Sequence, residues 1–204
     1  MLKFDKVFCF DFETESLNLV QSRPQQIAYT YSEKGRLIES AEFKILWKDL
    51  RMSADAARVT HFDKNKYLKE AIDPMIVWKK TQKYFLNKDV ALVFHNGLNF
   101  DCFQIKTWLV EIGQWPGFKH FYNRFVDTRA LYQAFINKTP VDKVNFDSWQ
   151  YIQIDDRKKG VKTTLKAMCE ALGIEFDEKL AHDATYDTTK TTEAFNQLKY
   201  RMSL

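Results

Sequence analysis

The chain has 204 residues, a formal net charge of +4 and a composition that is 45% hydrophobic and 28% charged. This hydrophobic fraction is too high for a disordered chain, and the low content of Gly (6) and Pro (4) excludes low-complexity and fibrous classes. The balance of 31 basic against 27 acidic residues permits a polyanionic partner without requiring one.

Cysteine usage and the N-terminal sequence indicate the compartment. Cys9, Cys102 and Cys169 are far apart and show no Cys-x-x-Cys pattern, so we expect reduced core thiols rather than disulfides or a zinc site. The first ten residues lack the apolar run and cleavage site of a signal peptide, and no stretch approaches the roughly 18 apolar residues of a membrane span. A cytoplasmic protein with no membrane association is therefore expected.

The predicted elements begin with three strands joined by short connections, which is typical of an antiparallel meander. These strands are Val7–Glu13, Gln25–Tyr31 and Leu37–Trp47. Strands and helices then alternate: a helix over Pro74–Leu86, a strand over Val90–His95, a helix over Phe100–Ile112 closed by Gly113, a strand over Phe121–Thr128 and a short helix through Phe135.

The last third of the chain is predicted to be largely helical. Residues from about 137 to 162 are polar and rich in turn formers, which predicts a loop or an insertion, and helices are expected over Thr163–Leu172 and Thr185–Arg201. This order predicts a single α/β domain over residues 1–204. Its mixed central sheet, antiparallel in the first three strands and then parallel, is expected to be flanked by helices.

Two carboxylates stand at the end of the first predicted strand. Because side chains alternate along a strand, Asp11 and Glu13 project from the same face, while Phe10 and Phe12 point to the opposite face and into the core. Neighbouring buried carboxylates repel each other unless a cation lies between them. The pair therefore indicates either a metal site or a solvated strand end.

Two further acidic positions are candidates for the same site. Asp101 follows a predicted strand and opens a helix, so it is either a helix cap or a metal ligand. His182 and Asp187 are five residues apart, which on one continuous helix would place them roughly 140° apart. They can share a target only if the helix begins near Ala184 and His182 lies in the loop before it; otherwise His182 is a surface residue.

The three motifs, in this order, resemble those of the DEDDh (DnaQ-like) 3′–5′ exonucleases of the ribonuclease-H-like superfamily. The chain supplies Asp11-Phe12-Glu13, Asn96…Phe100-Asp101 and His182-Asp183-Ala184-Thr185-Tyr186-Asp187, and the resemblance spans about residues 5–200. It implies a ribonuclease-H-like fold. Two departures are visible: His61 stands where the family usually has Gly, and the Asn96–Asp101 spacing is one residue longer than in many members.

The resemblance also implies a two-metal mechanism with Mg²⁺ or Mn²⁺, for which carboxylate oxygens are suitable ligands. Asp11 would bridge two ions, Glu13 and Asp187 would complete one, Asp101 would hold the other, and His182 would be the general base. The expected enzyme removes mononucleotides from the 3′ ends of single-stranded DNA or RNA.

Residues that contact the substrate are also expected from the resemblance, namely Thr14, Leu17 and Asn96, with Leu17 against the terminal base. Phe12, Phe100 and Trp149 could stack on bases, but core packing is favoured for Phe12 and Phe100. Asp127 is expected to support structure rather than to bind metal. The basic residues Arg157, Lys158, Lys159, Lys162 and Lys166 form either a phosphate-binding cluster or a solvated loop.

Two rival functions remain open from the sequence. One is a catalytically weak nucleic-acid-binding or polymerase-associated proofreading module on the same fold, and the other is an endonuclease of the same superfamily. A separate polymerase chain as a partner is compatible with the exonuclease interpretation.

Overall fold

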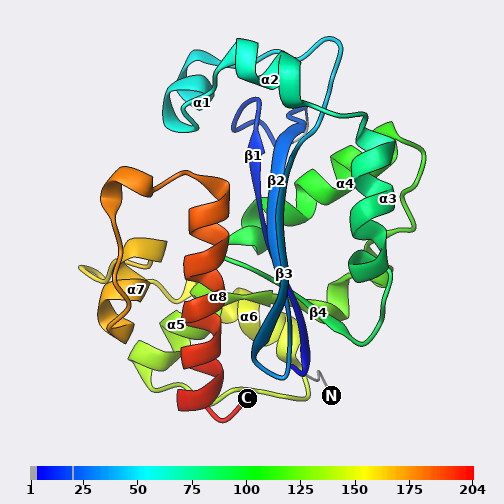
Figure 1. Ribbon diagram of the computed structural model, residues 1–204. Helices are drawn as coiled ribbons and strands as arrows, with labels where there is room; N and C mark the ends of the chain where they lie inside the picture. The colour runs from blue at the N-terminus through cyan, green and yellow to red at the C-terminus, as the bar shows by residue number, and fades with distance from the viewer. Residues whose placement is uncertain (1–3, 20) are drawn as a thin grey trace.

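A five-stranded sheet forms the centre of the computed structural model, which describes residues 4–19 and 21–204 (Figure 1). The strand order is β3-β2-β1-β4-β5. Strands β1 (Lys6–Thr14), β2 (Pro24–Glu33) and β3 (Arg36–Lys44) pair antiparallel, whereas β4 (Val90–Phe94) runs parallel to β1 and β5 (Phe125–Asp127) parallel to β4. The predicted mixed sheet is confirmed.

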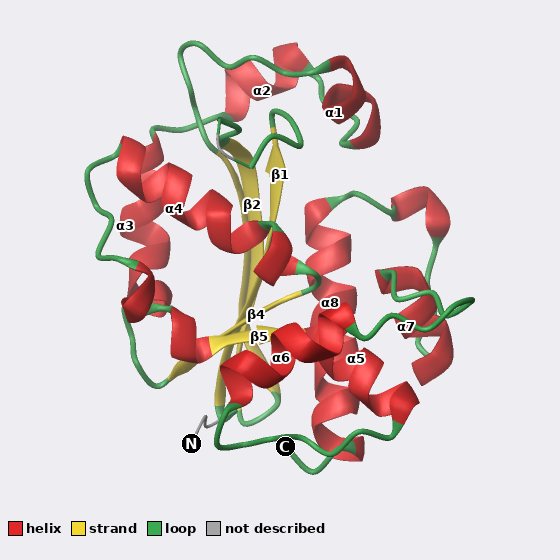
Figure 2. Ribbon diagram, turned by 180° about the vertical axis from the view of Figure 1, so that it is seen from behind, coloured by secondary structure: helices red, strands yellow, loops and turns green. Residues whose placement is uncertain are grey.

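Helices cover both faces of the sheet, as Figures 1 and 2 show from opposite sides. One face carries α5 (Thr128–Asn137), α7 (Leu165–Leu172) and α8 (Ala184–Arg201), and the other carries α3 (Pro74–Phe85) and α4 (Asp101–Glu111). Two short helices, α1 (Ala54–Val59) and α2 (Lys64–Glu70), lie near the carboxyl-terminal end of β1 (Figure 1). The predicted flanking helices are therefore present.

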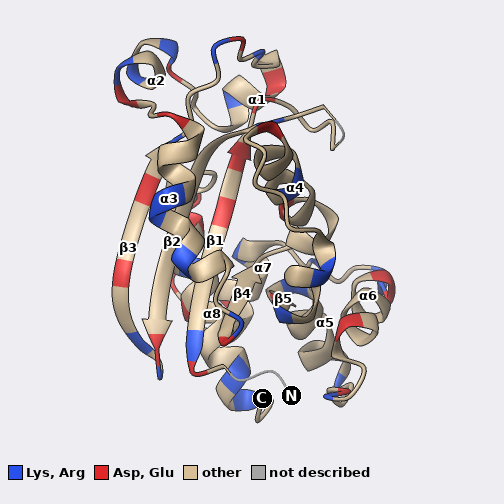
Figure 3. Ribbon diagram, turned by 90° about the vertical axis from the view of Figure 1, so that its right-hand side faces the viewer, with Lys and Arg blue, Asp and Glu red and all other residues tan. Residues whose placement is uncertain are grey.

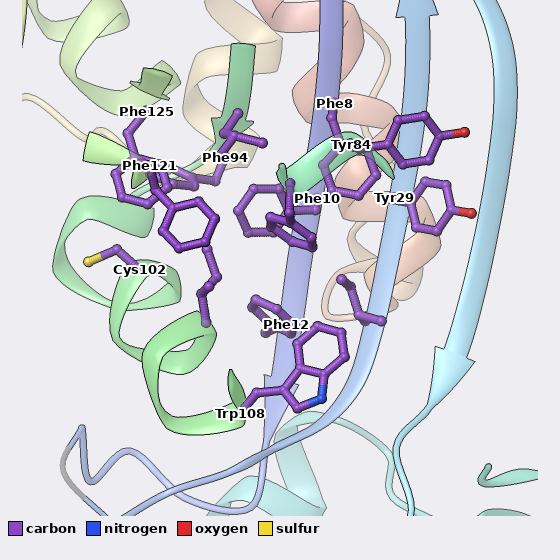
Figure 4. Packing of buried hydrophobic residues seen from close by; sticks show 14 of the residues in the cluster. Phe8, Phe10, Phe12, Tyr29, Tyr84, Phe94, Cys102, Trp108, Phe121 and Phe125 are labelled. Atoms are coloured by element: carbon purple, nitrogen blue, oxygen red, sulfur yellow. The ribbon is translucent and has the colours of Figure 1, made fainter. Parts of the chain in front are cut away.

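Alternation along β1 separates two hydrophobic cores. Phe8, Phe10 and Phe12 belong to a large aromatic core on the α3–α4 face, shown in Figure 4, while Val7 and Cys9 belong to the core on the α8 face. Burying a large apolar side chain contributes about 1.5–3 kcal/mol, so this alternation fixes the register of β1 strongly. As a consequence, Asp11 and Glu13 must project on the α8 side.

The region predicted as a loop or an insertion over about 137 to 162 contains a helix, α6 (Phe146–Asp155), so the expectation of a loop was wrong for its middle part. Its buried face includes Trp149 and Ile154 together with Gln150 and Gln153. The side-chain amide of Gln150 bonds the backbone of β5 as a neighbouring strand would. It accepts from the N of Asp127 at 2.7 Å and donates to the carbonyl of Phe125 at 3.0 Å. Polar residues on the buried face hid the helical pattern.

The strand expected over Phe121–Thr128 is shorter, because a 3₁₀ turn over Tyr122–Arg124 precedes β5. The turn directs the side chain of Arg124 inward, where its guanidinium donates to the backbone carbonyls of Phe85, Asn87 and Val90. These bonds stabilise the turn in place of extended chain.

The three cysteines are free and buried, as predicted. Within residues 4–19 and 21–204, no helix is both long and apolar enough to cross a membrane.

Candidate active site

Strand β1 extends further than its parallel neighbour. Its pairing with β4 ends at Cys9, opposite Val93, whereas its pairing with β2 continues to Thr14. The acidic residues of β1 lie towards its carboxyl-terminal end, as Figure 3 shows. Asp11 and Glu13 therefore project from a part of β1 that pairs with β2 but not with β4. The space beyond the end of β4 is open to side chains from other elements of the chain.

Asp101 occupies part of that space. It is the first residue of α4, it is 3% exposed, and its Oδ1 accepts a hydrogen bond from the N of Phe12 at 3.1 Å. Of the two alternatives for Asp101, the helix cap is excluded, because the N-cap position is Phe100 and makes no side-chain cap bond. The carboxylate satisfies the backbone of β1 instead, midway between Asp11 and Glu13 in the sequence.

The start of α8 brings the fourth carboxylate to the same place. The helix begins at Ala184 with Asp183 as its N-cap, and His182 lies before it in a left-handed conformation with φ 67°. The N of His182 donates to Oδ2 of Asp187 at 3.1 Å. This is the arrangement under which His182 and Asp187 were expected to share a target, and the imidazole itself is exposed.

The electrostatics of the site disfavour four ionised carboxylates. Burial raises the pKa of Asp11, Glu13 and Asp101 above their ordinary values, and the charges of neighbouring carboxylates raise them further. Burial also raises the pKa of Asp187 to about 6, although the hydrogen bond from the N of His182 opposes the change. The repulsion would be relieved by a cation among them.

The donor set fits a hard divalent cation, because it consists of carboxylate oxygens. In addition, Oδ1 of Asp187 is buried without a hydrogen-bond partner. In the part of the chain that the structure describes, no group of three or more His, Cys, Asp or Glu side chains already has the arrangement of a metal site. The carboxylates are therefore suitable in chemistry and location, but their side chains would have to turn toward a shared ion.

A cavity of about 440 Å³ opens beside these residues, lined in part by Asp11, Asn96, His182 and Asp187. The structure thus brings Asn96 to the site, as expected, although its side-chain Oδ1 already accepts hydrogen bonds from Asn99 and Arg129.

Asp127 fixes the turn that leads to Asp101. It is fully buried and accepts hydrogen bonds from the N atoms of Asn96 (2.8 Å), Leu98 (3.1 Å) and Arg129 (2.9 Å). Gly97 is required at this turn, because a Cβ there would lie 2.3 Å from the ring of Phe94. The position of Asp127 agrees with a supporting role.

The expected substrate contacts are only partly available. Phe12 is 3% exposed and packs edge-on against Phe10 and Trp108, so its favoured place in the core is confirmed and the alternative that its ring stacks on a base was wrong. Thr14 is 5% exposed and its hydroxyl donates to the carbonyl of Ser16. By contrast Leu17 is 82% exposed and free to meet a ligand, and Phe100 is partly buried.

The basic cluster divides in the structure. Arg157, Lys158, Lys159 and Lys162 are exposed, whereas Lys166 forms ion pairs with Glu170 and Glu178. A residue not considered from the sequence, Arg129 in the first turn of α5, lines the carboxylate cavity. The signal in the sequence was that Arg129 follows Asp127 by two residues, and Asp127 was already expected to support the site.

The mixed five-stranded sheet with helices on both faces has the ribonuclease-H-like fold. Residues 8–195 match the family model described as exonuclease, and the chain belongs to this exonuclease family. The family resemblance drawn from the motifs is confirmed. No curated protein matches the chain.

Solved structures of exonuclease I share the fold. A zinc-bound complex of Escherichia coli exonuclease I with single-stranded DNA superposes with a TM-score of 0.77 at 16% identity, covering 98% of this chain and 42% of that one. The E. coli enzyme with a dA16 oligonucleotide gives a TM-score of 0.77 at 17% identity over the same shares. The chain spans less than half the length of these proteins.

Proposed function

We propose that the chain is a divalent-metal-dependent 3′–5′ exonuclease that releases mononucleotides from the 3′ ends of single-stranded nucleic acid. The DNA complexes of the E. coli relatives favour DNA over RNA as the substrate. One observation carries the proposal: carboxylates from β1, α4 and α8 gather at the end of β1, where Asp101 is bonded to the backbone between Asp11 and Glu13.

The four carboxylates Asp11, Glu13, Asp101 and Asp187 would hold two Mg²⁺ or Mn²⁺ ions, with Asp11 shared between them. Bound divalent ions would neutralise charge on the scissile phosphate and acidify the attacking water. His182 would accept the proton of that water at its imidazole, whose exposed position allows the proton to pass on to solvent. Leu17 would lie against the terminal base.

The hydrogen bond from the N of His182 to Asp187 is the contact that keeps base and carboxylate together. Because the backbone donates it, the left-handed conformation of His182 holds the loop close to Asp187 whatever the protonation state of the imidazole. The hydrogen bond therefore leaves both ring nitrogens of His182 outside this contact.

Digestion of matched end-labelled DNA and RNA oligonucleotides, with Mg²⁺ or with EDTA, tests the proposal. We expect a 5′-labelled strand to shorten stepwise and a 3′-labelled strand to release labelled mononucleotide at once, with both reactions stopped by EDTA. Internal cuts would indicate an endonuclease, and binding without hydrolysis would indicate the non-catalytic module.

The matched variants are Asp11→Asn, which should abolish hydrolysis in a folded protein, and Asp5→Asn, an exposed residue just before β1 that should leave it unchanged. Metal-dependent activity retained by folded Asp11→Asn would rule out this site. A separate polymerase partner and a cytoplasmic location stay predictions.

A further inference from the structure

A cationic side chain lines the same cavity as the carboxylates. Arg129, in the first turn of α5, lines the same space of about 440 Å³ as Asp11, His182 and Asp187. Helices α5 and α8 lie side by side on one face of the sheet (Figures 1 and 2). Acidic residues of β1 and α8 and the basic Arg129 of α5 therefore line one cavity.

The guanidinium of Arg129 is anchored without being neutralised. Its Nη1 donates to Oδ1 of Asn96, and its Nε is buried without a hydrogen-bond partner. Across residues 4–19 and 21–204, no carboxylate lies within ion-pair distance of Arg129. Asp127 and Asp155 act on Arg129 only from beyond ion-pair distance, so a partly buried guanidinium with an unpaired donor is better satisfied when an anion binds to it directly.

The register of the sheet places this cation relative to the expected strand of nucleic acid. Cys9 lies beside Val93 in the parallel pair, so Asn96, which anchors Arg129, follows β4 at about the level of Asp11. Leu17 lies beyond Glu13, further along the chain. If the terminal nucleotide lies at Leu17 and the scissile phosphate at the carboxylates, the nucleotides on the 5′ side of the scissile bond lie near Arg129.

We propose that Arg129 binds the phosphodiester on the 5′ side of the scissile bond, an inference that rests on the proposed exonuclease function. The planar donors of a guanidinium match two phosphate oxygens, and such charge-assisted bonds are about twice as strong as neutral ones. Arg157 lies close enough to Arg129 to add a second positive charge there. The Nε2 of His95 bonds the carbonyl of Thr163 at 3.2 Å, and Thr163 lines the cavity.

The test is a binding titration by fluorescence anisotropy. A 5′-fluorescein-labelled single-stranded DNA is titrated in EDTA at several KCl concentrations, with wild type, Arg129→Gln, Arg129→Lys and the control Arg36→Gln. Arg36 is exposed at the start of β3, at the opposite end of the sheet from Glu13. Circular dichroism establishes that each variant is folded.

We expect Arg129→Gln to raise Kd about ten-fold or more at low salt. It should also reduce the slope of log K against log salt by about 0.7, the contribution of one phosphate contact on a single strand. Arg129→Lys should keep the slope, and Arg36→Gln should change neither quantity. An unchanged Kd for Arg129→Gln would overturn the proposed contact. A higher Kd with an unchanged salt slope would also overturn it, and would make Arg129 only a positioning residue for Asn96.

An oligonucleotide with one uncharged methylphosphonate linkage, placed just 5′ of the terminal linkage, gives an independent measurement. It should bind wild type more weakly than the native strand does, yet bind wild type and Arg129→Lys alike. If Arg129→Gln does not fold, this comparison decides: equal binding of both strands by wild type refutes the contact. Because the titrations run in EDTA, a wild type without nuclease activity would refute the proposed function without deciding this inference.

Discussion

Replacing Asp187 by Asn should stabilise the metal-free protein. The carboxylate is largely buried, one oxygen accepts from the N of His182, and the other oxygen has no partner. An asparagine of nearly the same shape keeps an oxygen for His182 and removes the charge that burial disfavours.

The magnitude follows from the pKa of Asp187, which burial raises from 3.8 to about 6. Because the pKa is higher in the folded state, the carboxyl group contributes full stability below about pH 3.8 and loses its contribution as the pH rises to about 6. The difference of about two pKa units corresponds to about 3 kcal/mol at pH 8, and to about half of that at pH 5. We expect Asp187→Asn to recover much of this loss.

Thermal unfolding followed by circular dichroism measures the effect. In EDTA at pH 8, Asp187→Asn should raise Tm by several degrees, since about 1 kcal/mol shifts Tm by about 2–4 °C in a chain of this size. The gain should be smaller at pH 5. In saturating Mg²⁺ the order should reverse, because the wild type binds the ion more tightly and gains more stability from it. A lower Tm for the variant in EDTA, or a gain independent of pH, would refute the reasoning.

Three further substitutions test separate parts of the site. His182→Ala should lower kcat by about 10²–10⁴ with little change in KM, measured by steady-state oligonucleotide digestion; a change mainly in KM would exclude the general-base role. Asp127→Ala leaves three backbone N–H groups without their acceptor and should lower the free energy of unfolding in urea by about 3 kcal/mol or more. An unchanged free energy of unfolding would contradict the supporting role of Asp127. Gln150→Leu removes two buried hydrogen bonds and should lower that free energy by about 2 kcal/mol while kcat persists, and a neutral result would show that they contribute little.

The mixed sheet could be predicted from the sequence because its strands carry strong local patterns. In β1 the alternation of Phe8, Phe10 and Phe12 with Asp11 and Glu13 predicts both the strand and the face to which each side chain points. Connections were short enough to make the antiparallel order of the first three strands evident. The start of α8 was also predictable, because His182 and Asp187 can lie close together only if the helix begins near Ala184.

Other features could not be read from local patterns. Helix α1 buries none of its residues and α2 buries only Tyr67, so neither shows an apolar period. Helix α6 presents glutamines to the interior, and their value depends on backbone groups of β5 that are distant in sequence. The partners of Asp101 and Arg129 likewise lie 89 and 33 residues away, so only the folded chain reveals what each side chain does.

The hydrogen bond between Asp101 and the N of Phe12 has a consequence for aggregation. Where β4 stops, β1 would otherwise present an uncovered strand edge, which is the feature through which sheets of separate molecules join. The side chain of Asp101 at that edge accepts the hydrogen bond that the N of Phe12 would otherwise offer to another strand. The residue expected to serve the reaction therefore also occupies a backbone donor of β1 that a strand of another molecule could otherwise use.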